Sequence, residues 1–110
     1  MISDQWDVVR VPFPFTDQAA VKKRPAAVLT TRAFNAASGH TIMAMITKRD
    51  NSNWPSDYEI IDWASANLKF PCWLRAKLFT IENSLIVDRL GRLSPVDAKA
   101  ALAELRKVLW

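Results

Sequence analysis

The sequence predicts one small domain, mainly β, in which a strongly bent sheet or barrel is completed by a C-terminal helix. Three observations lead to this fold class. Short runs of β-branched and aromatic residues follow one another, with turn signals between them. A helical period of apolar residues appears clearly only at the C-terminus. The length of 110 residues, of which 50% are hydrophobic, suits a single core. We therefore expect one domain over residues 1–110.

The expected strands are bounded by polar segments or by glycine and proline. The first leaves the sheet near Pro12, because proline supplies no N–H to the ladder. The third contains a continuous apolar run from Ile42 to Ile46, which suits a strand covered on both faces, although a buried helix would show the same pattern. In chain order the expected strands cover Trp6–Phe15, Ala26–Thr30, His40–Thr47, Tyr58–Ile61, Trp73–Thr80 and Ser84–Leu90.

The C-terminal helix has the clearest local signals. Ser94 is a suitable N-cap, Pro95 suits the first helical position, and Asp97 lies in the positive first turn. A shorter helical turn, capped by Asp62, is expected over Asp62–Ala66. One apolar face of the C-terminal helix must pack on a sheet or a partner, and it consists of Ala98, Ala101, Leu102, Leu105, Val108 and Leu109.

Charge is unevenly distributed along the chain, whose formal net charge is +4. Residues 22–49 contain six basic side chains and no acidic one, whereas residues 50–62 contain four acidic and no basic one. A concentrated positive patch favours a nucleic-acid partner, because neutralising phosphates supplies most sequence-independent affinity. A solvated surface cluster is the alternative explanation.

Several function classes are excluded by what the sequence lacks. No apolar run is long enough to span a membrane, and the acidic N-terminus differs from a secretory signal, so a soluble cytoplasmic protein is expected. A single cysteine, Cys72, and a single histidine, His40, leave no disulfide and no zinc cluster. The two glycines, Gly39 and Gly91, are isolated and form no phosphate-binding loop. We therefore expect no metal and no cofactor.

The remaining chemistry is that of arginine and hydroxyl groups. Cleavage of RNA without a metal requires the 2′-hydroxyl to attack the adjacent phosphorus, which places extra charge on the phosphate oxygens. A guanidinium can stabilise that charge through paired hydrogen bonds, and a hydroxyl can orient the phosphate. The candidates are Arg24, where the first long loop re-enters the sheet before the second expected strand, and Thr47, at the end of the third. Each alone has an ordinary explanation as a surface arginine or a strand threonine.

Three blocks of sequence resemble the MazF/PemK-like toxins of bacterial toxin–antitoxin modules. The first is DVVRVPFPFTD from Asp7, the second is KKRPAAVL from Lys22, and the third is AMIT, ending at Thr47. The segments 75–86 and 90–94 are similar to the second half of that family. The resemblance covers nearly the whole chain, and the first two blocks are specific as an ordered pair.

The resemblance implies a small MazF/CcdB-like barrel and a metal-independent endoribonuclease that cuts single-stranded RNA. Attack by the 2′-hydroxyl is expected to leave a 2′,3′-cyclic phosphate and a 5′-hydroxyl. The family's catalytic arginine and phosphate-orienting threonine align with Arg24 and Thr47. Arg75 matches a strand arginine used in some members, whereas Lys77 stands where those members have an acidic residue. The residues expected to contact RNA are Thr16, Asp17, Gln18, Lys22, Lys23, Lys48, Arg75 and Lys77.

The expected partners are single-stranded RNA, a cognate acidic antitoxin and a second copy of the chain in a homodimer. The sequence departs from the family pattern at Trp6, where a glycine is usual, in the glycine-free first loop, and at Glu82, where an aspartate is frequent. A different cleavage specificity is expected from these changes. The alternative function is that of a non-cleaving member of the same barrel group, either a gyrase-poisoning toxin like CcdB or a nucleic-acid or protein-binding module.

Overall fold

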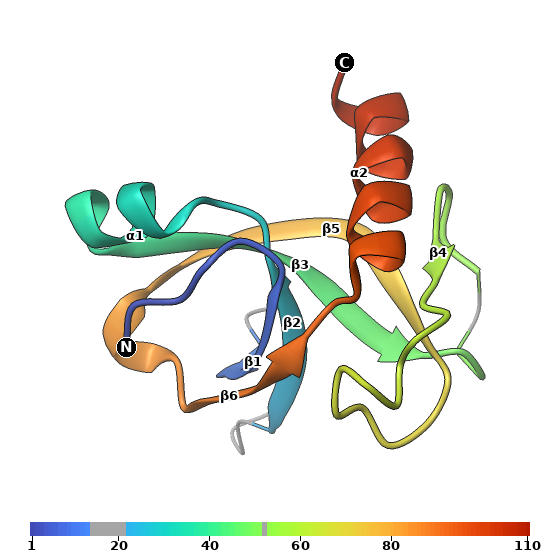
Figure 1. Cartoon of the computed structure of the whole chain (residues 1–110), viewed down its shortest axis with the longest axis horizontal. Coiled ribbons are helices and arrows are strands. Elements are labelled where there is room, and N and C mark those ends of the chain that lie inside the picture. The colour runs from blue at the N-terminus through green and yellow to red at the C-terminus, as the bar shows by residue number, and fades with distance from the viewer. Residues whose placement is uncertain (14–21, 52) are drawn as a thin grey trace.

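The computed structural model describes residues 1–13, 22–51 and 53–110, which form six strands, two α-helices and one 3₁₀ helix (Figure 1). The expectation of one domain over residues 1–110 stays a prediction. In chain order the elements are β1 (Asp7–Pro12), β2 (Lys23–Val28), α1 (Arg32–Ser38), β3 (His40–Lys48), β4 (Tyr58–Glu59), β5 (Cys72–Glu82), η1 (Asn83–Leu85), β6 (Asp88–Arg92) and α2 (Pro95–Leu109).

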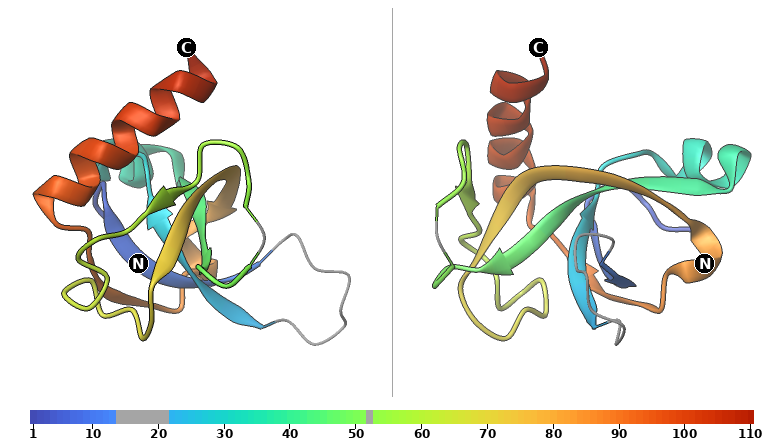
Figure 2. Two further views of the ribbon diagram at one scale, coloured as in Figure 1. Left: turned by 90° about the vertical axis from the view of Figure 1, so that its right-hand side faces the viewer. Right: turned by 180° about the vertical axis from the view of Figure 1, so that it is seen from behind.

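The strands form one curled antiparallel sheet in the order β4-β5-β3-β2-β1-β6. Figure 2 shows β3 and β5 running together along its length, with α2 standing at one end. Between the pairs Ala44–Leu78 and Met45–Arg75, β5 contains two more residues than β3. Such a bulge bends and twists the sheet locally. The predicted fold class, a strongly bent sheet with a C-terminal helix, is confirmed.

The two faces of the sheet carry separate apolar clusters, as strand alternation requires. The cluster on the first face includes Val8, Ala27 and Ala44 and is completed by Ala101 and Leu105 of α2. Part of the predicted apolar face of the helix therefore packs on the sheet, whereas Leu102, Val108 and Leu109 of that face are exposed. The neighbouring strand residues point the other way, and the second cluster contains Val9, Val11, Phe13, Ala26, Val28, Met43, Phe79, Ile81 and Ile86.

Helix α1 was not expected from the sequence. Its N-cap is Thr31, whose hydroxyl accepts a hydrogen bond from the Phe34 N–H at 3.3 Å. It ends at Gly39, which adopts a left-handed φ of 72° that suits glycine. The segment has both capping signals but only 7 helical residues, too few for an apolar period to be visible.

Two further expectations need correction. The strand expected over Ser84–Leu90 begins only at Asp88, because residues 83–85 form η1. At Asp62–Ala66 one i→i+4 hydrogen bond, from the Ala66 N–H to the Asp62 carbonyl at 3.2 Å, closes the expected turn, but among the described residues the Asp62 side chain makes no capping hydrogen bond. Asp62 is itself held through its backbone N–H, which donates to the Asp97 carboxylate at 2.8 Å.

The remaining strand boundaries differ from prediction by a few residues. β1 ends at Pro12 as expected, β2 already begins at Lys23, and β4 is limited to Tyr58–Glu59. Gly91 of β6 lies so close to the loop before β5 that an added β-carbon would stand 2.6 Å from the Ala66 carbonyl oxygen.

Among the described residues, no helix combines the length and apolar character needed to cross a membrane.

Candidate active site

Arg24 is the second residue of β2, and its guanidinium lies over an aromatic side chain. Its Cζ atom is 5.7 Å from the centre of the Phe13 ring. Phe13 is 5% exposed and meets Phe79 edge-on, with ring centres 5.9 Å apart. The Arg24 Nε is buried and has no hydrogen-bond partner among the described residues. The contact with Phe13, which itself packs against Phe79, therefore helps to position the Arg24 guanidinium.

Thr47 is near the end of β3, with only 6% of its surface exposed. Its Oγ1 accepts a hydrogen bond from the side-chain amide of Asn51, with 2.5 Å between the two atoms. Across the β3–β5 ladder Thr47 pairs with Trp73. Asn51 therefore fixes the hydroxyl from the loop that follows the strand, and its role was not visible in the sequence.

Strand register places Arg24 and Thr47 on the same face of the sheet. The last pair between β2 and β3 is Ala26 with Met45. Arg24 and Thr47 each lie two residues beyond this pair, so alternation points them to the same side as Ala26 and Met45. Beyond the pair the strands diverge (Figure 2). The two predicted catalytic residues therefore flank the open end of a ladder.

Arg75 and Lys77 lie on this same face. Arg75 pairs with Met45, and Lys77 follows two positions later, inside the bulge. Arg75 is 8% exposed, and both Nε and Nη2 donate to the Asp57 carboxylate, at 3.1 and 2.9 Å. The Lys77 Nζ lies 5.3 Å from the centre of the Trp54 ring. Reasoning from the sequence missed the contributions of Asp57 and Trp54.

The other residues predicted to contact RNA do not all lie on the face that carries Arg24 and Thr47. Lys48 belongs to the opposite face, since it pairs with core residue Cys72, and its Nζ lies 4.6 Å from the centre of the Phe70 ring. A small hollow of about 150 Å³ opens there. Lys22 and Lys23 are exposed at the start of β2. Thr16, Asp17 and Gln18 lie outside the described residues.

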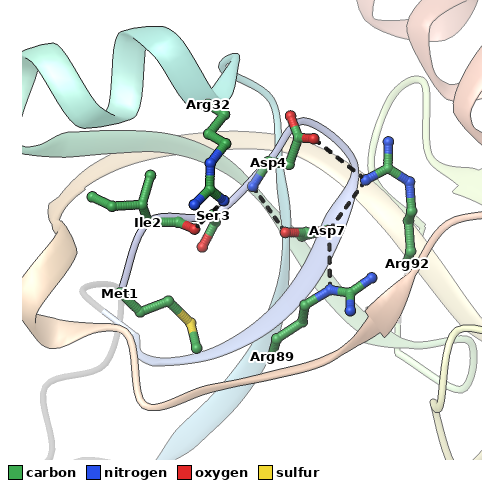
Figure 3. A pocket seen from close by; sticks show the side chains of 8 residues that line it. All are labelled: Met1, Ile2, Ser3, Asp4, Asp7, Arg32, Arg89 and Arg92. Atoms are coloured by element: carbon green, nitrogen blue, oxygen red, sulfur yellow. Dashed lines mark hydrogen bonds and ion pairs between the residues drawn. The ribbon is translucent and has the colours of Figure 1, made fainter.

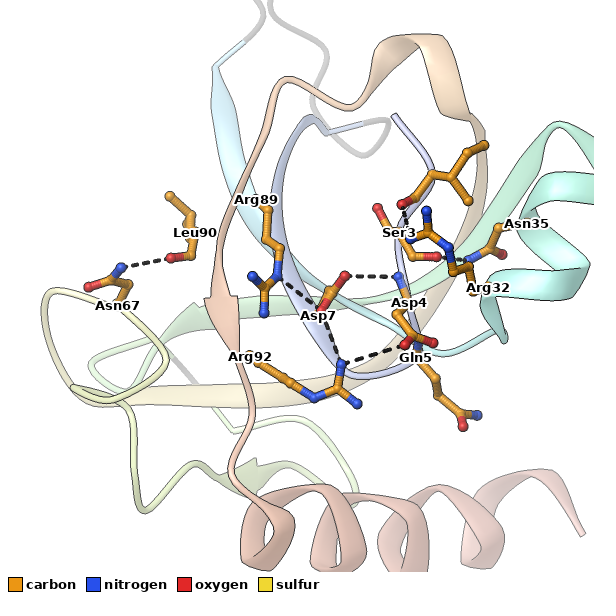
Figure 4. Close-up of polar contacts among 11 residues, drawn as sticks. Ser3, Asp4, Gln5, Asp7, Arg32, Asn35, Asn67, Arg89, Leu90 and Arg92 are labelled. Atoms are coloured by element: carbon orange, nitrogen blue, oxygen red, sulfur yellow. Dashed lines mark hydrogen bonds and ion pairs between the residues drawn. The ribbon is translucent and has the colours of Figure 1, made fainter.

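A larger hollow of about 280 Å³ lies at the other end of β1 (Figure 3). Buried Asp7 accepts hydrogen bonds from Arg89 at 3.1 Å and Arg92 at 3.4 Å, and from the Asp4 N–H at 2.8 Å. Figure 4 shows the two arginines approaching Asp7 from β6. Their evident task is to neutralise Asp7 and tie β6 to the N-terminal segment.

Cys72 and the acidic residues offer no competing chemistry in the described part of the chain. Burial raises the pKa of the Cys72 thiol to about 11, although the nearby Lys48 acts in the opposite direction. The thiol donates to the Phe70 carbonyl at 3.2 Å. Within residues 1–13, 22–51 and 53–110, no three histidine, cysteine, aspartate or glutamate side chains are grouped as metal ligands.

Comparisons with known proteins agree with the fold and with the sequence blocks. Structures similar in fold include MazF from Deinococcus radiodurans, at 17% identity and a TM-score of 0.77, with 99% of this chain and 97% of that chain covered. A mycobacterial endoribonuclease in complex with its cognate antitoxin matches at 13% identity and a TM-score of 0.77, covering 97% and 94%. No curated protein sequence matches significantly.

The family comparison covers most of the chain. Residues 4–109 match the model of the PemK-like, MazF-like toxin of type II toxin–antitoxin systems. This range contains Arg24, Thr47 and every strand and helix described above. The chain therefore belongs to the PemK-like, MazF-like family of type II toxins.

Proposed function

We propose that this toxin is a metal-independent endoribonuclease that cleaves single-stranded RNA in the cytoplasm. The 2′-hydroxyl oxygen forms a bond to the adjacent phosphorus while the bond to the 5′-oxygen breaks. The attacking hydroxyl loses its proton and the departing oxygen gains one. The products are a 2′,3′-cyclic phosphate and a 5′-hydroxyl.

The single observation that carries this proposal is the arrangement of Arg24 and Thr47 on one face at the open end of the β2–β3 ladder. The Arg24 guanidinium is assigned to the phosphate oxygens, where charge grows during attack. The Thr47 hydroxyl, fixed by Asn51, is assigned to orienting the same phosphate. A guanidinium stays charged at any accessible pH, so Arg24 can stabilise the charge on the phosphate oxygens without a metal ion.

Single strands are the expected substrate. The 2′-hydroxyl must swing in line with the leaving oxygen, and the bases must separate from their neighbours, which an A-form duplex resists. Lys22 and Lys23 are exposed beside Arg24 and supply sequence-independent attraction for the phosphate backbone.

The test is cleavage of single-stranded RNA in the presence of a chelator, comparing wild type with Arg24→Ala. We expect a loss of roughly 10² to 10³ in rate for Arg24→Ala, with no change in circular dichroism. Arg106→Ala, at an exposed position of α2, is the matched control and should cleave normally. Activity lost in EDTA and restored by magnesium would contradict the proposal, as would a folded Arg24→Ala protein that cleaves at the wild-type rate. Toxicity retained without RNA cleavage would favour a CcdB-like or purely binding function.

We also propose that the toxin acts as a homodimer and is neutralised by an acidic antitoxin. The net charge of +4 and the exposed lysines at the start of β2 support an acidic partner. Exposed apolar side chains on α2, among them Val108 and Leu109 at 49% and 51% exposure, support a further contact surface. Light scattering at micromolar concentration tests the dimer, and a fully active monomer would contradict it. An antitoxin that binds without lowering RNA cleavage would contradict the neutralisation.

A further inference from the structure

We propose that the indole of Trp54 is a stacking platform for one nucleobase of the bound strand, and that Asp57 and Arg75 hold it in position. This inference rests on the proposed function, because the base belongs to the RNA whose phosphate lies at Arg24 and Thr47. It assigns a base-binding site to a residue outside the sequence blocks that carry the catalytic pair.

Trp54 is fixed by a tight turn at the end of the loop between β3 and β4. Its N–H donates to the Asp57 carboxylate at 2.9 Å, and the Asp57 N–H donates to the Trp54 carbonyl at 3.0 Å. Ser56, inside the turn, adopts a positive φ of 63°. These two bonds close the turn from both ends, so the position of the indole depends on Asp57.

Arg75 anchors the turn to the sheet. The Asp57 carboxylate accepts from Arg75 through both oxygens, in the two-pronged geometry that makes such pairs strong. The side chains are only 10% and 5% exposed. Breaking such a buried pair leaves an uncompensated charge and is costly. The pair therefore ties the loop to β5 at the level of Met45, two residues before Thr47.

The indole of Trp54 remains accessible to a nucleobase although Asp57 and Arg75 hold its turn in place. Trp54 is 41% exposed, while the Arg75 Cζ and the Lys77 Nζ lie 5.8 and 5.3 Å from its ring centre. Such contacts with cations fix the ring further and place positive charge beside it. An exposed aromatic ring next to cations combines the two elements of single-strand binding, a stacking surface for the base and positive charge for the backbone.

The ring also lies on the face that carries the catalytic candidates. Arg75 and Lys77 point to the same side of the sheet as Thr47 and Arg24, and their contacts bring Trp54 to that side. A strand with one phosphate at Arg24 and Thr47 would therefore pass Trp54 with a neighbouring nucleotide. In this arrangement Arg75 is a positioning residue that acts through Asp57. Lys77 is the residue assigned to the phosphate backbone of the RNA.

The experiment measures binding separately from cleavage. In an Arg24→Ala background, the affinity for fluorescein-labelled single-stranded RNA of mixed sequence is compared with that for an abasic oligonucleotide of equal length. Trp54→Ala should weaken RNA binding roughly 5- to 150-fold, the range for one stacked base, and leave abasic binding unchanged. Trp54→Phe should retain most of the affinity. Lys77→Ala should weaken binding of both probes.

Two controls distinguish stacking from other causes. Trp110→Ala removes another exposed tryptophan, 86% exposed at the C-terminus, and should change neither affinity. Asp57→Asn should reproduce part of the Trp54→Ala defect on RNA alone, because the turn loses its ion pair. Thermal unfolding checks that each variant is folded.

Equal loss of RNA and abasic binding in Trp54→Ala would overturn the stacking proposal. Unchanged RNA affinity combined with a lost antitoxin contact would also overturn it and assign Trp54 to a protein interface. Failure of the nuclease proposal would appear differently, as protein with the native Arg24 that binds the same labelled RNA without cleaving it.

Discussion

The guanidinium of Arg24 is held over the ring of Phe13, with 5.7 Å between Cζ and the ring centre. Phe13 is nearly buried and packs against Phe79, so the ring has little freedom to move. A cation over an aromatic face gains about 0.5 to 2 kcal/mol, depending on solvent exposure. The aromatic core of the second face therefore helps to position the candidate catalytic cation.

Phe13→Leu should reduce cleavage without unfolding the protein. Leucine keeps an apolar side chain in the cluster but removes the aromatic face beneath Arg24. We expect cleavage to fall at least tenfold, because a displaced catalytic group costs rate steeply, while the unfolding midpoint falls only modestly. Single-turnover cleavage and urea unfolding measure the two effects. A leucine variant with full activity would show that Phe13 does not position Arg24.

Arg24→Lys tests whether charge alone is sufficient. Lysine keeps the positive charge but lacks the planar pair of donors that binds two phosphate oxygens. The expected rate is close to that of Arg24→Ala, and RNA affinity should be nearly that of wild type. Cleavage by the lysine variant at the wild-type rate would show that a point charge is enough.

Asn51→Ala should lower cleavage through Thr47. Its amide donates to the Thr47 hydroxyl, so its loss leaves that hydroxyl free to rotate. We expect a smaller rate loss than that caused by Thr47→Val, and a combined variant no worse than Thr47→Val alone, because Asn51 acts through the hydroxyl. Additive losses in the double variant would show that Asn51 has a separate role.

The sequence was informative where local rules operate and less so where distant segments meet. The C-terminal helix, with Ser94 and Pro95 at its start, and the end of β1 at Pro12 follow from capping and proline chemistry. Helix α1 was missed because 7 residues are too few to display a period. Ser84 and Leu85 were assigned to a strand because the apolar run Leu85-Ile86-Val87 follows Ser84 directly, whereas residues 83–85 form η1.

In the candidate site, too, some residues could be predicted from short stretches of sequence, whereas contacts between distant segments could not. Arg24 and Thr47 were visible because sequence blocks identify them, and the register then places both on one face. The clamp between Asp57 and Arg75 joins residues 18 positions apart on different elements, and no pattern within either segment predicts it. The opposite orientation of Lys48 follows from its position directly after Thr47, because neighbouring strand residues point to opposite faces.

Asp97→Ala should destabilise the protein strongly. The sequence suggested only a favourable charge in the first helical turn, but Asp97 is fully buried and accepts from Tyr58, Ser94 and the backbone N–H groups of Ile61 and Asp62. Each buried donor left without a partner costs about 1 to 3 kcal/mol, so we expect a loss of at least about 3 kcal/mol in urea unfolding. Asp97→Asn keeps one acceptor oxygen and should lose less. Equal stability of all three proteins would contradict this role.

Alkylation of Cys72 should be slow in the folded protein and should depend on pH in a defined direction. Burial raises the thiol pKa to about 11, so at pH 8 only about one thiol in a thousand is ionised, against about a quarter for an ordinary cysteine. Because the folded pKa is raised, the neutral thiol contributes stability below its ordinary pKa, and that contribution is lost as pH rises toward 11. Iodoacetamide labelling at pH 8 should be at least about a hundredfold slower in the folded chain than in guanidinium. Cys72→Ala should still cleave RNA, since the proposed reaction uses no thiol. Rapid labelling of the native protein, together with loss of cleavage in Cys72→Ala, would instead identify Cys72 as a reactive group.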